Sequence, residues 1–262
     1  MIPKIIHYCW FGGNPLPEMA TKCIESWKKF CPEYEIKQWD ESNFDVTCCK
    51  YVKEAYDQKK WAFVTDYVRL YALVTQGGIY MDTDVEVLKP LDPYLNNEAF
   101  SGFESETEIP TGIMGCEKEF PLFEELLNAY NNRSFVNSDG SQDLTTNVIE
   151  ITNYCKSKGF IGNNTMQVIE GFRLYPKDFF CPKDYKTGEI NVTENTVTIH
   201  HFSGSWINEN YRIVSQIIRK YDKSGKIKLI SAIKAFPYWL RGSIQINGLK
   251  GTIKNIVLFR IK

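Results

Sequence analysis

The stretch "GGIYMDTDVEVLKPLDPYL", residues 77–95, decides how the chain is expected to fold. Ile79, Tyr80 and Met81 form an apolar run typical of a buried strand, and Asp82 and Asp84 follow it one residue apart. Alternate residues of a regular strand point to the same face, so both carboxylates would reach one divalent cation that relieves their repulsion. Oxygen ligands favour Mg²⁺ or Mn²⁺ over zinc.

On its own this pattern leaves an alternative open, namely two solvated acids in a polar turn or on an exposed strand edge. The preceding segment, residues 61–73, adds information because Asp66 and Arg69 lie three residues apart and therefore on one face of a predicted helix. That helix is largely apolar, and a buried Asp–Arg pair is costly. We therefore expect a polar ligand pocket here, rather than an ion pair on a solvated face.

The neighbouring segments predict an α/β sheet. Residues 4–13 indicate a strand ending in a glycine turn, residues 17–30 a helix, and residues 34–40 a second strand. Residues 49–75 are mostly helical in pattern, and the Gly77–Gly78 pair ends that helix. The first third of the chain thus reads β-α-β-α-β, which favours helices packed on a sheet.

Composition limits the architecture and the class of protein. The chain has 262 residues, 43% of them hydrophobic, which is enough for one sizeable core. Eight cysteines show neither CxxC pairs nor zinc-type spacing, so we expect reduced thiols. We see no signal peptide and no apolar run long enough to span a membrane, and so predict a cytosolic location. Residues 211–262 carry twelve lysines and arginines and a single acid, Asp222.

Three separated blocks carry a family resemblance: "IPKIIHYCWFGG" (2–13), "AFVTDYVRLYALVTQGGIYMDTDVEVLKPLD" (62–92) and "IHHFSGSW" (199–206). Together they resemble the DxD glycosyltransferases of family 32, which include initiating mannosyltransferases, capsule and lipopolysaccharide sugar transferases and, more distantly, clostridial glucosylating toxins. The resemblance implies a GT-A fold, a single nucleotide-binding α/β domain with a mixed central sheet. We place this domain at residues 1–222 and a helical, basic, amphipathic tail at residues 223–262.

The resemblance also implies roles for individual residues. The sugar would contact Asp66 and Arg69, and the metal would be held by Asp82, Asp84 and His201. The remaining donor contacts would come from Trp10, stacked on the base, Tyr80 near the nucleoside, and Ser205 and Trp206 at the diphosphate. Without the match, Trp10 would be interpreted as a core aromatic. Candidate pocket residues are Asp143, Thr146 and Asn147, and Glu104 would meet donor or acceptor, or be a surface acid.

His200 and His201 are two of only three histidines. Strand alternation sends them to opposite faces, so only one can face the metal. We favour His201 as that ligand.

The implied function is a retaining, metal-dependent glycosyltransferase that moves a hexose from a nucleotide-sugar to a glycan or lipid-linked acceptor in bacterial surface polysaccharide synthesis, such as capsule. The cofactors would be Mn²⁺ or Mg²⁺ and a nucleotide-sugar, with UDP-hexose favoured over GDP-mannose. The alternatives are a non-catalytic nucleotide- or glycan-binding relative, and a metal-dependent phosphohydrolase, which would not explain Trp10 or "SGSW". No nucleic-acid partner is expected.

The tail carries an apolar stripe, Leu229, Ile230, Ile233, Phe236, Trp239 and Leu240, among cations. This pattern favours either peripheral membrane contact or packing on protein. Pro237 is expected to divide the tail into two short helical segments.

Overall fold

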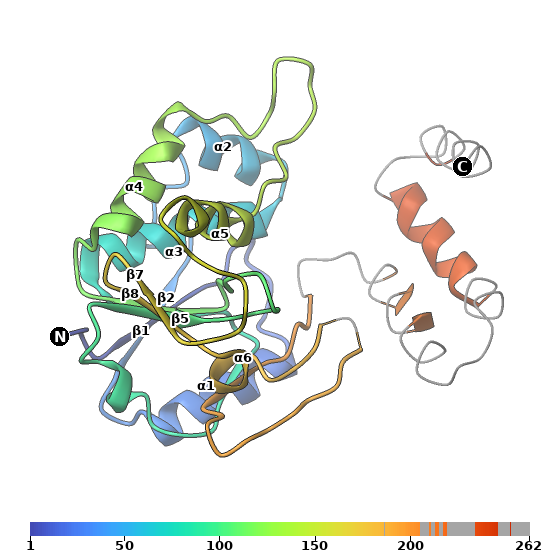
Figure 1. Cartoon of the computed structure of the whole chain (residues 1–262). Coiled ribbons are helices and arrows are strands. Elements are labelled where there is room, and N and C mark those ends of the chain that lie inside the picture. The colour runs from blue at the N-terminus through green and yellow to red at the C-terminus, as the bar shows by residue number, and fades with distance from the viewer. Residues whose placement is uncertain are drawn as a thin grey trace. The chain divides into compact units, whose positions relative to one another are not determined.

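The computed structural model describes residues 1–185, 187–204 and, beyond these, 210, 213, 214, 217, 218, 234–245 and 252 (Figure 1). The chain divides into two compact units. The first comprises residues 1–184 and 190–202, and the second comprises residues 185–189 and 203–262.

The first unit is built on a seven-stranded sheet with the strand order β2-β1-β3-β6-β5-β8-β7. A separate two-stranded ladder joins β4 to β9. The strands are β1 (Ile5–Cys9), β2 (Glu35–Trp39), β3 (Gly78–Met81), β4 (Val85–Val87), β5 (Ala99–Gly102), β6 (Ile113–Cys116), β7 (Gln167–Ile169), β8 (Phe172–Tyr175) and β9 (Thr198–His200). The helices are α1 (Glu18–Phe30), α2 (Lys50–Asp57), α3 (Trp61–Gln76), α4 (Pro121–Ala129), α5 (Asn147–Ser157) and α6 (Lys177–Phe180), with short 3-10 turns at Asp92–Tyr94 and Tyr130–Asn132.

Helices cover both faces of the sheet. Figure 1 shows α2, α3, α4 and α5 on one face and α1 and α6 on the other. Two apolar clusters match this layering, one around α3 and the other around α1. The predicted α/β domain with a mixed central sheet is therefore confirmed.

The link between α3 and β3 depends on two glycines. Gly77 ends α3 with a φ of 66°, and Gly78 follows with a φ of 98°. A Cβ at Gly78 would lie 2.7 Å from the carbonyl oxygen of Ile5, on the neighbouring strand. Only glycine combines this backbone conformation with so close an approach, and the chain can therefore turn directly from a buried helix into the central strand.

Strand directions bring the ends of β3 and β5 to the same edge of the sheet. Both strands pair antiparallel with β6, which lies between them, so they run parallel to each other. Side chains that follow Met81 and Gly102 therefore lie at one edge, where a ligand site is commonly found in α/β sheets.

His7 occupies the sheet interior on β1. Trp39 Nε1 donates to His7 Nδ1 at 3.2 Å, so the ring is neutral with its proton on Nε2, which donates to the Gly77 carbonyl at 2.8 Å. Burial lowers the pKa of His7 to about 4, against the opposing effect of the Gly77 bond. His7 is thus a hydrogen-bonded core residue.

In the second unit, residues 234–245 form one continuous helix that includes Pro237. The helix continues through Pro237, so the expectation that this proline ends a helix is wrong within residues 234–245, whereas the part of the expected first segment before residue 234 lies outside the described residues. The carbonyl that its missing N–H would have used belongs to residue 233, ahead of the described turn, so no bond inside the described helix is lost. Ser243 is buried and pairs with Thr252, whereas Phe236 is half exposed.

Several expectations for the C-terminal region are not decided by this helix. The predicted stripe residues Leu229, Ile230 and Ile233 lie outside the described residues, as does the predicted boundary at residue 222. In the part of the chain that is described, no helix is both long and apolar enough to cross a membrane.

Candidate active site

A tight turn between β3 and β4 carries the two aspartates. The strand ends at Met81, and the Val85 amide donates to the Asp82 carbonyl at 3.0 Å, which closes the turn. The expectation that the strand continues through Asp84 is therefore wrong. The two carboxylates converge because the chain reverses here, not because of strand alternation.

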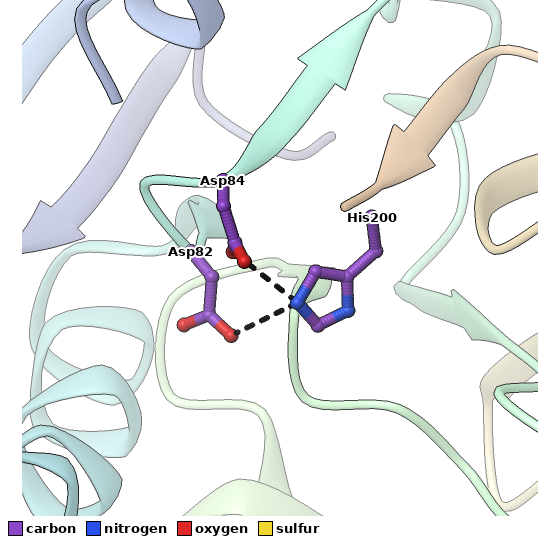
Figure 2. Close-up of side chains that lie close together, drawn as sticks. All are labelled: Asp82, Asp84 and His200. Atoms are coloured by element: carbon purple, nitrogen blue, oxygen red, sulfur yellow. Dashed lines mark ion pairs between the residues drawn. The ribbon is translucent and has the colours of Figure 1, made fainter. Parts of the chain in front are cut away.

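His200 completes a cluster with these aspartates. Its Nε2 lies 3.2 Å from Asp84 Oδ1 and 3.8 Å from Asp82 Oδ2 (Figure 2). One ligand atom from each of the three residues lies within 4.8 Å of the others. Asp84 and His200 are buried, while Asp82 is partly accessible. The cluster is thus a compact set of two oxygen donors and one nitrogen donor.

The structure corrects the predicted choice of histidine. His201 Nε2 contacts Glu86 Oε2 at 2.8 Å, on the opposite side of the ladder from the two aspartates. The reason is the register of β4 with β9, in which Val85 pairs with His200. Adjacent strand residues point to opposite faces, so His201 lies on the face of Glu86 and His200 on the other face, and the turn that precedes β4 brings Asp84 to His200.

The charges around His200 differ from those of an ordinary buried histidine. Burial by itself lowers its pKa, but Asp84, with Cys181 as a further contributor, outweighs this effect. The pKa of His200 is therefore raised well above its usual value. Without a cation, the imidazolium neutralises part of the carboxylate charge.

Arg69 connects the cluster to α3. Its Nη2 lies 3.4 Å from both Asp66 Oδ1 and Asp82 Oδ1, and its Nη1 donates to the Thr111 carbonyl at 2.9 Å. The expectation that Asp66 and Arg69 share a face of a largely buried helix is confirmed, and the two side chains pair with each other there. Arg69 Nε is buried and makes no hydrogen bond with any described residue.

Tyr80 lies within this network. Its ring is buried beneath the Arg69 guanidinium, 4.8 Å from ring centroid to Cζ, and its hydroxyl donates to Asp82 Oδ1 at 2.8 Å. The structure thus gives Tyr80 a contact that orients Asp82, and its predicted approach to a nucleoside stays a prediction.

Asp66 is held from its other side by the start of α5. The Asn147 amide donates to Asp66 Oδ2 at 3.3 Å, and Asn147 Nδ2 donates to the Asp66 carbonyl at 2.6 Å. Burial raises the pKa of Asp66 to about 6, although Arg69 opposes that shift. Of the other candidate pocket residues, Asp143 is paired with Arg133 at 2.7 Å, and Thr146 precedes the helix.

In the loop that joins β5 to β6, the sequence pattern indicated Glu104 but not Gly112. The Gly112 carbonyl accepts the Asp82 amide at 2.9 Å, and a Cβ at Gly112 would lie 2.7 Å from His200 Nδ1. Gly112 is therefore required by the close approach of the ring. The signal was a glycine just ahead of a buried strand.

The remaining predicted donor residues are only partly described. Trp10 follows β1, is half-buried, and donates from Nε1 to the Asn14 carbonyl at 2.6 Å. Its stacking on a base stays a prediction. Ser205 and Trp206 lie outside the described residues.

Comparison with known families identifies this arrangement. Residues 17–101 match the family model described as a glycosyltransferase sugar-binding region containing a DXD motif. The match includes Asp66, Arg69, Asp82 and Asp84. The chain is thus similar to this glycosyltransferase family over residues 17–101.

Proteins similar to this chain are found in fungi and in a virus. Inositol phosphoceramide mannosyltransferase 3 of Schizosaccharomyces pombe is 35% identical over 125 residues, covering 46% of this chain and 35% of that protein. An uncharacterised glycosyltransferase of Acanthamoeba polyphaga mimivirus is 26% identical over 203 residues, covering 70% of this chain and 77% of that protein. The chain thus spans about a third of the length of the fungal mannosyltransferase that it matches.

Among solved structures, a glycosyltransferase involved in the glycosylation of the major capsid of PBCV-1 is similar with a TM-score of 0.42 and 12% identity. The similarity covers 77% of this chain and 95% of that chain.

The donor set fits a divalent cation of the kind that DXD glycosyltransferases typically use. Two carboxylates converge with a buried imidazole, and oxygen-rich sites favour Mg²⁺ or Mn²⁺. His200 Nε2 must lose its proton before it can act as a ligand, so cation binding would release a proton. Asp82, Asp84 and His200 are the residues that would hold the ion.

Proposed function

We propose that the protein is a metal-dependent glycosyltransferase that moves a hexose from a nucleotide-sugar to a glycan or lipid-linked acceptor with retention of configuration. The observation that carries this proposal is the convergence of Asp82, Asp84 and His200 at a sheet edge, inside a chain that matches the DXD family. A divalent cation bound there supplies positive charge for the diphosphate leaving group.

The protein's own residues would fix the geometry of this site. Asp82 is oriented by the Tyr80 hydroxyl and by Arg69, and Asp84 is oriented by His200. Preorganised ligands reduce the reorganisation needed when the substrate binds. Asp66 and Arg69 form the neighbouring polar surface, and we assign to them the hydroxyls of the donor sugar.

The proposed donor and acceptor rest on the family resemblance and on the names of similar proteins, not on the geometry of the site. The resemblance favours a UDP-hexose, and the mannosyltransferase names of the fungal relatives add GDP-mannose as the second donor to test. We propose an acceptor that belongs to a bacterial surface polysaccharide such as capsule, with the enzyme in the cytosol. Peripheral contact of the tail with the inner membrane face belongs to the same proposal.

A donor screen tests the proposal. Purified protein is incubated with UDP-glucose, UDP-galactose, UDP-N-acetylhexosamines or GDP-mannose, with Mn²⁺, Mg²⁺ or EDTA, and release of nucleoside diphosphate is measured. We expect release from one donor with Mn²⁺ or Mg²⁺ and none with EDTA. Binding of a donor without release would favour the non-catalytic relative, and absence of both would contradict the proposal.

A further inference from the structure

We propose that Glu104 is a further residue of the sugar-transfer site, where its carboxylate accepts a hydrogen bond from a hydroxyl of a bound sugar. This inference rests on the proposed function and deepens it. Glu104 follows the end of β5 by two residues. Since β5 runs parallel to β3 across β6, Glu104 leaves the sheet at the edge where Asp82 and Asp84 follow β3.

The loop between β5 and β6, which includes Glu104, lies against the cluster of Asp82, Asp84 and His200. Its last residues before β6 make three contacts there: the Thr111 carbonyl accepts Arg69, the Gly112 carbonyl accepts the Asp82 amide, and Gly112 packs on the His200 ring. The end of this loop thus contacts Arg69, Asp82 and His200.

The position of Glu104 within this loop is fixed. Its amide donates to the Glu108 carbonyl at 2.8 Å, which closes a short reversal of the chain. The preceding residue, Phe103, is fully buried and packs on Phe160 with 5.3 Å between ring centroids. Ser105 Oγ donates to the Glu108 carboxylate at 2.9 Å. The backbone at Glu104 is thus held on both sides, which limits the space that its side chain can reach.

The Glu104 carboxylate lacks a direct partner within the described part of the chain. No hydrogen bond or ion pair joins it to any described residue, although the side chain is half-buried. Burial raises its pKa, His200 opposes that rise, and Asp82 and Arg69 also act on it electrostatically. A partly desolvated carboxylate without donors is costly, so this position favours a ligand that brings a donor.

A hydroxyl suits this position better than a cation does. Glu104 is not among the three residues whose ligand atoms converge, and those residues already provide two carboxylates. A further cation would also lie close to Arg69 and His200. A neutral sugar hydroxyl donates to a carboxylate without that repulsion. The hydroxyl would come from either the donor sugar or the acceptor sugar, which the experiment below separates.

The test compares Glu104→Ala and Glu104→Gln with a matched control, Glu106→Gln, an exposed acid of the same loop. Four quantities are measured with Mn²⁺: affinity for UDP or GDP alone, affinity for the active nucleotide-sugar, its hydrolysis by water, and transfer to an added glycan. Loss of a hydrogen bond to a charged group corresponds to about a 10- to 100-fold change. We expect losses of this size for Glu104→Ala, smaller ones for Glu104→Gln, and none for Glu106→Gln.

The pattern of loss identifies the sugar. Reduced hydrolysis together with reduced transfer assigns the hydroxyl to the donor, whereas reduced transfer with normal hydrolysis assigns it to the acceptor. In both cases the affinity for UDP or GDP alone stays unchanged, which a general loss of structure would not allow.

Two results would overturn the role of Glu104: both variants match the wild type in hydrolysis and transfer, or affinity for UDP or GDP falls as much as turnover does. An inactive wild type would instead contradict the transferase proposal itself.

Discussion

His7 and His200 are both buried histidines of the same unit, yet their surroundings have opposite effects. His7 lies between the Trp39 indole and the Gly77 carbonyl, both neutral, and burial lowers its pKa to about 4. His200 lies against Asp84 and Asp82, and its pKa is raised well above the usual value despite burial. Both rings are buried, so the charge of the neighbouring groups explains why one pKa is lowered and the other is raised.

This difference indicates which region supports the fold and which binds a ligand. The neutral His7 region satisfies its own hydrogen bonds and needs nothing further. The His200 region collects two acids and a cationic imidazole in a small volume, an arrangement that a divalent cation would complete. A buried histidine among carboxylates is therefore the stronger indication of a functional site.

Asp84→Asn should produce the largest effect, because it makes the surroundings of His200 more like those of His7. We expect sugar transfer at saturating Mn²⁺ to fall by about 100-fold or more, since the cluster loses one of two carboxylates. Glu86→Gln is the control, because Glu86 contacts His201 on the other side of the ladder. Turnover close to that of the wild type for Asp84→Asn would show that the cluster does not hold the catalytic cation.

His7→Gln tests the neutral region through protein stability. His7 has an ordinary pKa of 6.5 and a folded-state pKa of about 4, so the unfolded chain binds the proton more tightly. The stabilisation from neutral His7 is therefore fully present above pH 6.5 and is lost as the pH falls towards 4, by about 3 kcal/mol. Glutamine offers the same donor and acceptor without titrating.

The measurement is chemical denaturation of the metal-free wild type and His7→Gln between pH 7 and pH 4. The difference between the two unfolding free energies should change in favour of the variant as the pH falls. Equal pH dependence in both proteins would show that His7 is not held neutral. His200 has a raised pKa and therefore contributes stability below pH 6.5 that is lost as the pH rises. Its effect on the pH dependence of unfolding is thus opposite to that of His7.

Trp10→Ala should produce the smallest effect. Trp10 continues β1 beyond His7, and its amide donates to the Trp39 carbonyl at 2.9 Å. If its ring stacks on the donor base, the variant loses about 1–3 kcal/mol of nucleotide affinity with little change in stability. Trp39→Phe, which removes the donor to His7, should lower the stability of the protein with little change in nucleotide affinity. Calorimetric titration with UDP and GDP distinguishes these outcomes, and unchanged affinity in Trp10→Ala would make Trp10 a packing residue.

Several strong local patterns predicted the structure well. The apolar helix with Asp66 and Arg69, the glycine pair and the strand after it all follow from patterns within residues 61–82, and the structure has them as α3 and β3. The pairing of Asp66 with Arg69 is equally local, because residues three apart share a helix face.

The wrong choice of histidine arose where distant segments meet. Glu86 and His201 are 115 positions apart, and no local pattern states that β9 pairs with β4 in the register that places His201 on the face of Glu86. The contact of Gly112 with the His200 ring likewise depends on tertiary packing. Strand alternation correctly placed the two histidines on opposite faces, but the register together with the turn that carries Asp82 and Asp84 decides which histidine meets the aspartates.

Manganese affinity of His200→Ala and His201→Ala, measured by calorimetry or electron paramagnetic resonance in the presence of UDP or GDP, tests the central claim most directly. His200 Nε2 lies 3.2 Å from Asp84, whereas His201 contacts Glu86. We predict that His200→Ala weakens Mn²⁺ binding by about 10- to 100-fold and that His201→Ala leaves it nearly unchanged. The reverse ranking, or equal affinity in both variants and the wild type, would contradict the assignment of Asp82, Asp84 and His200 as the metal site.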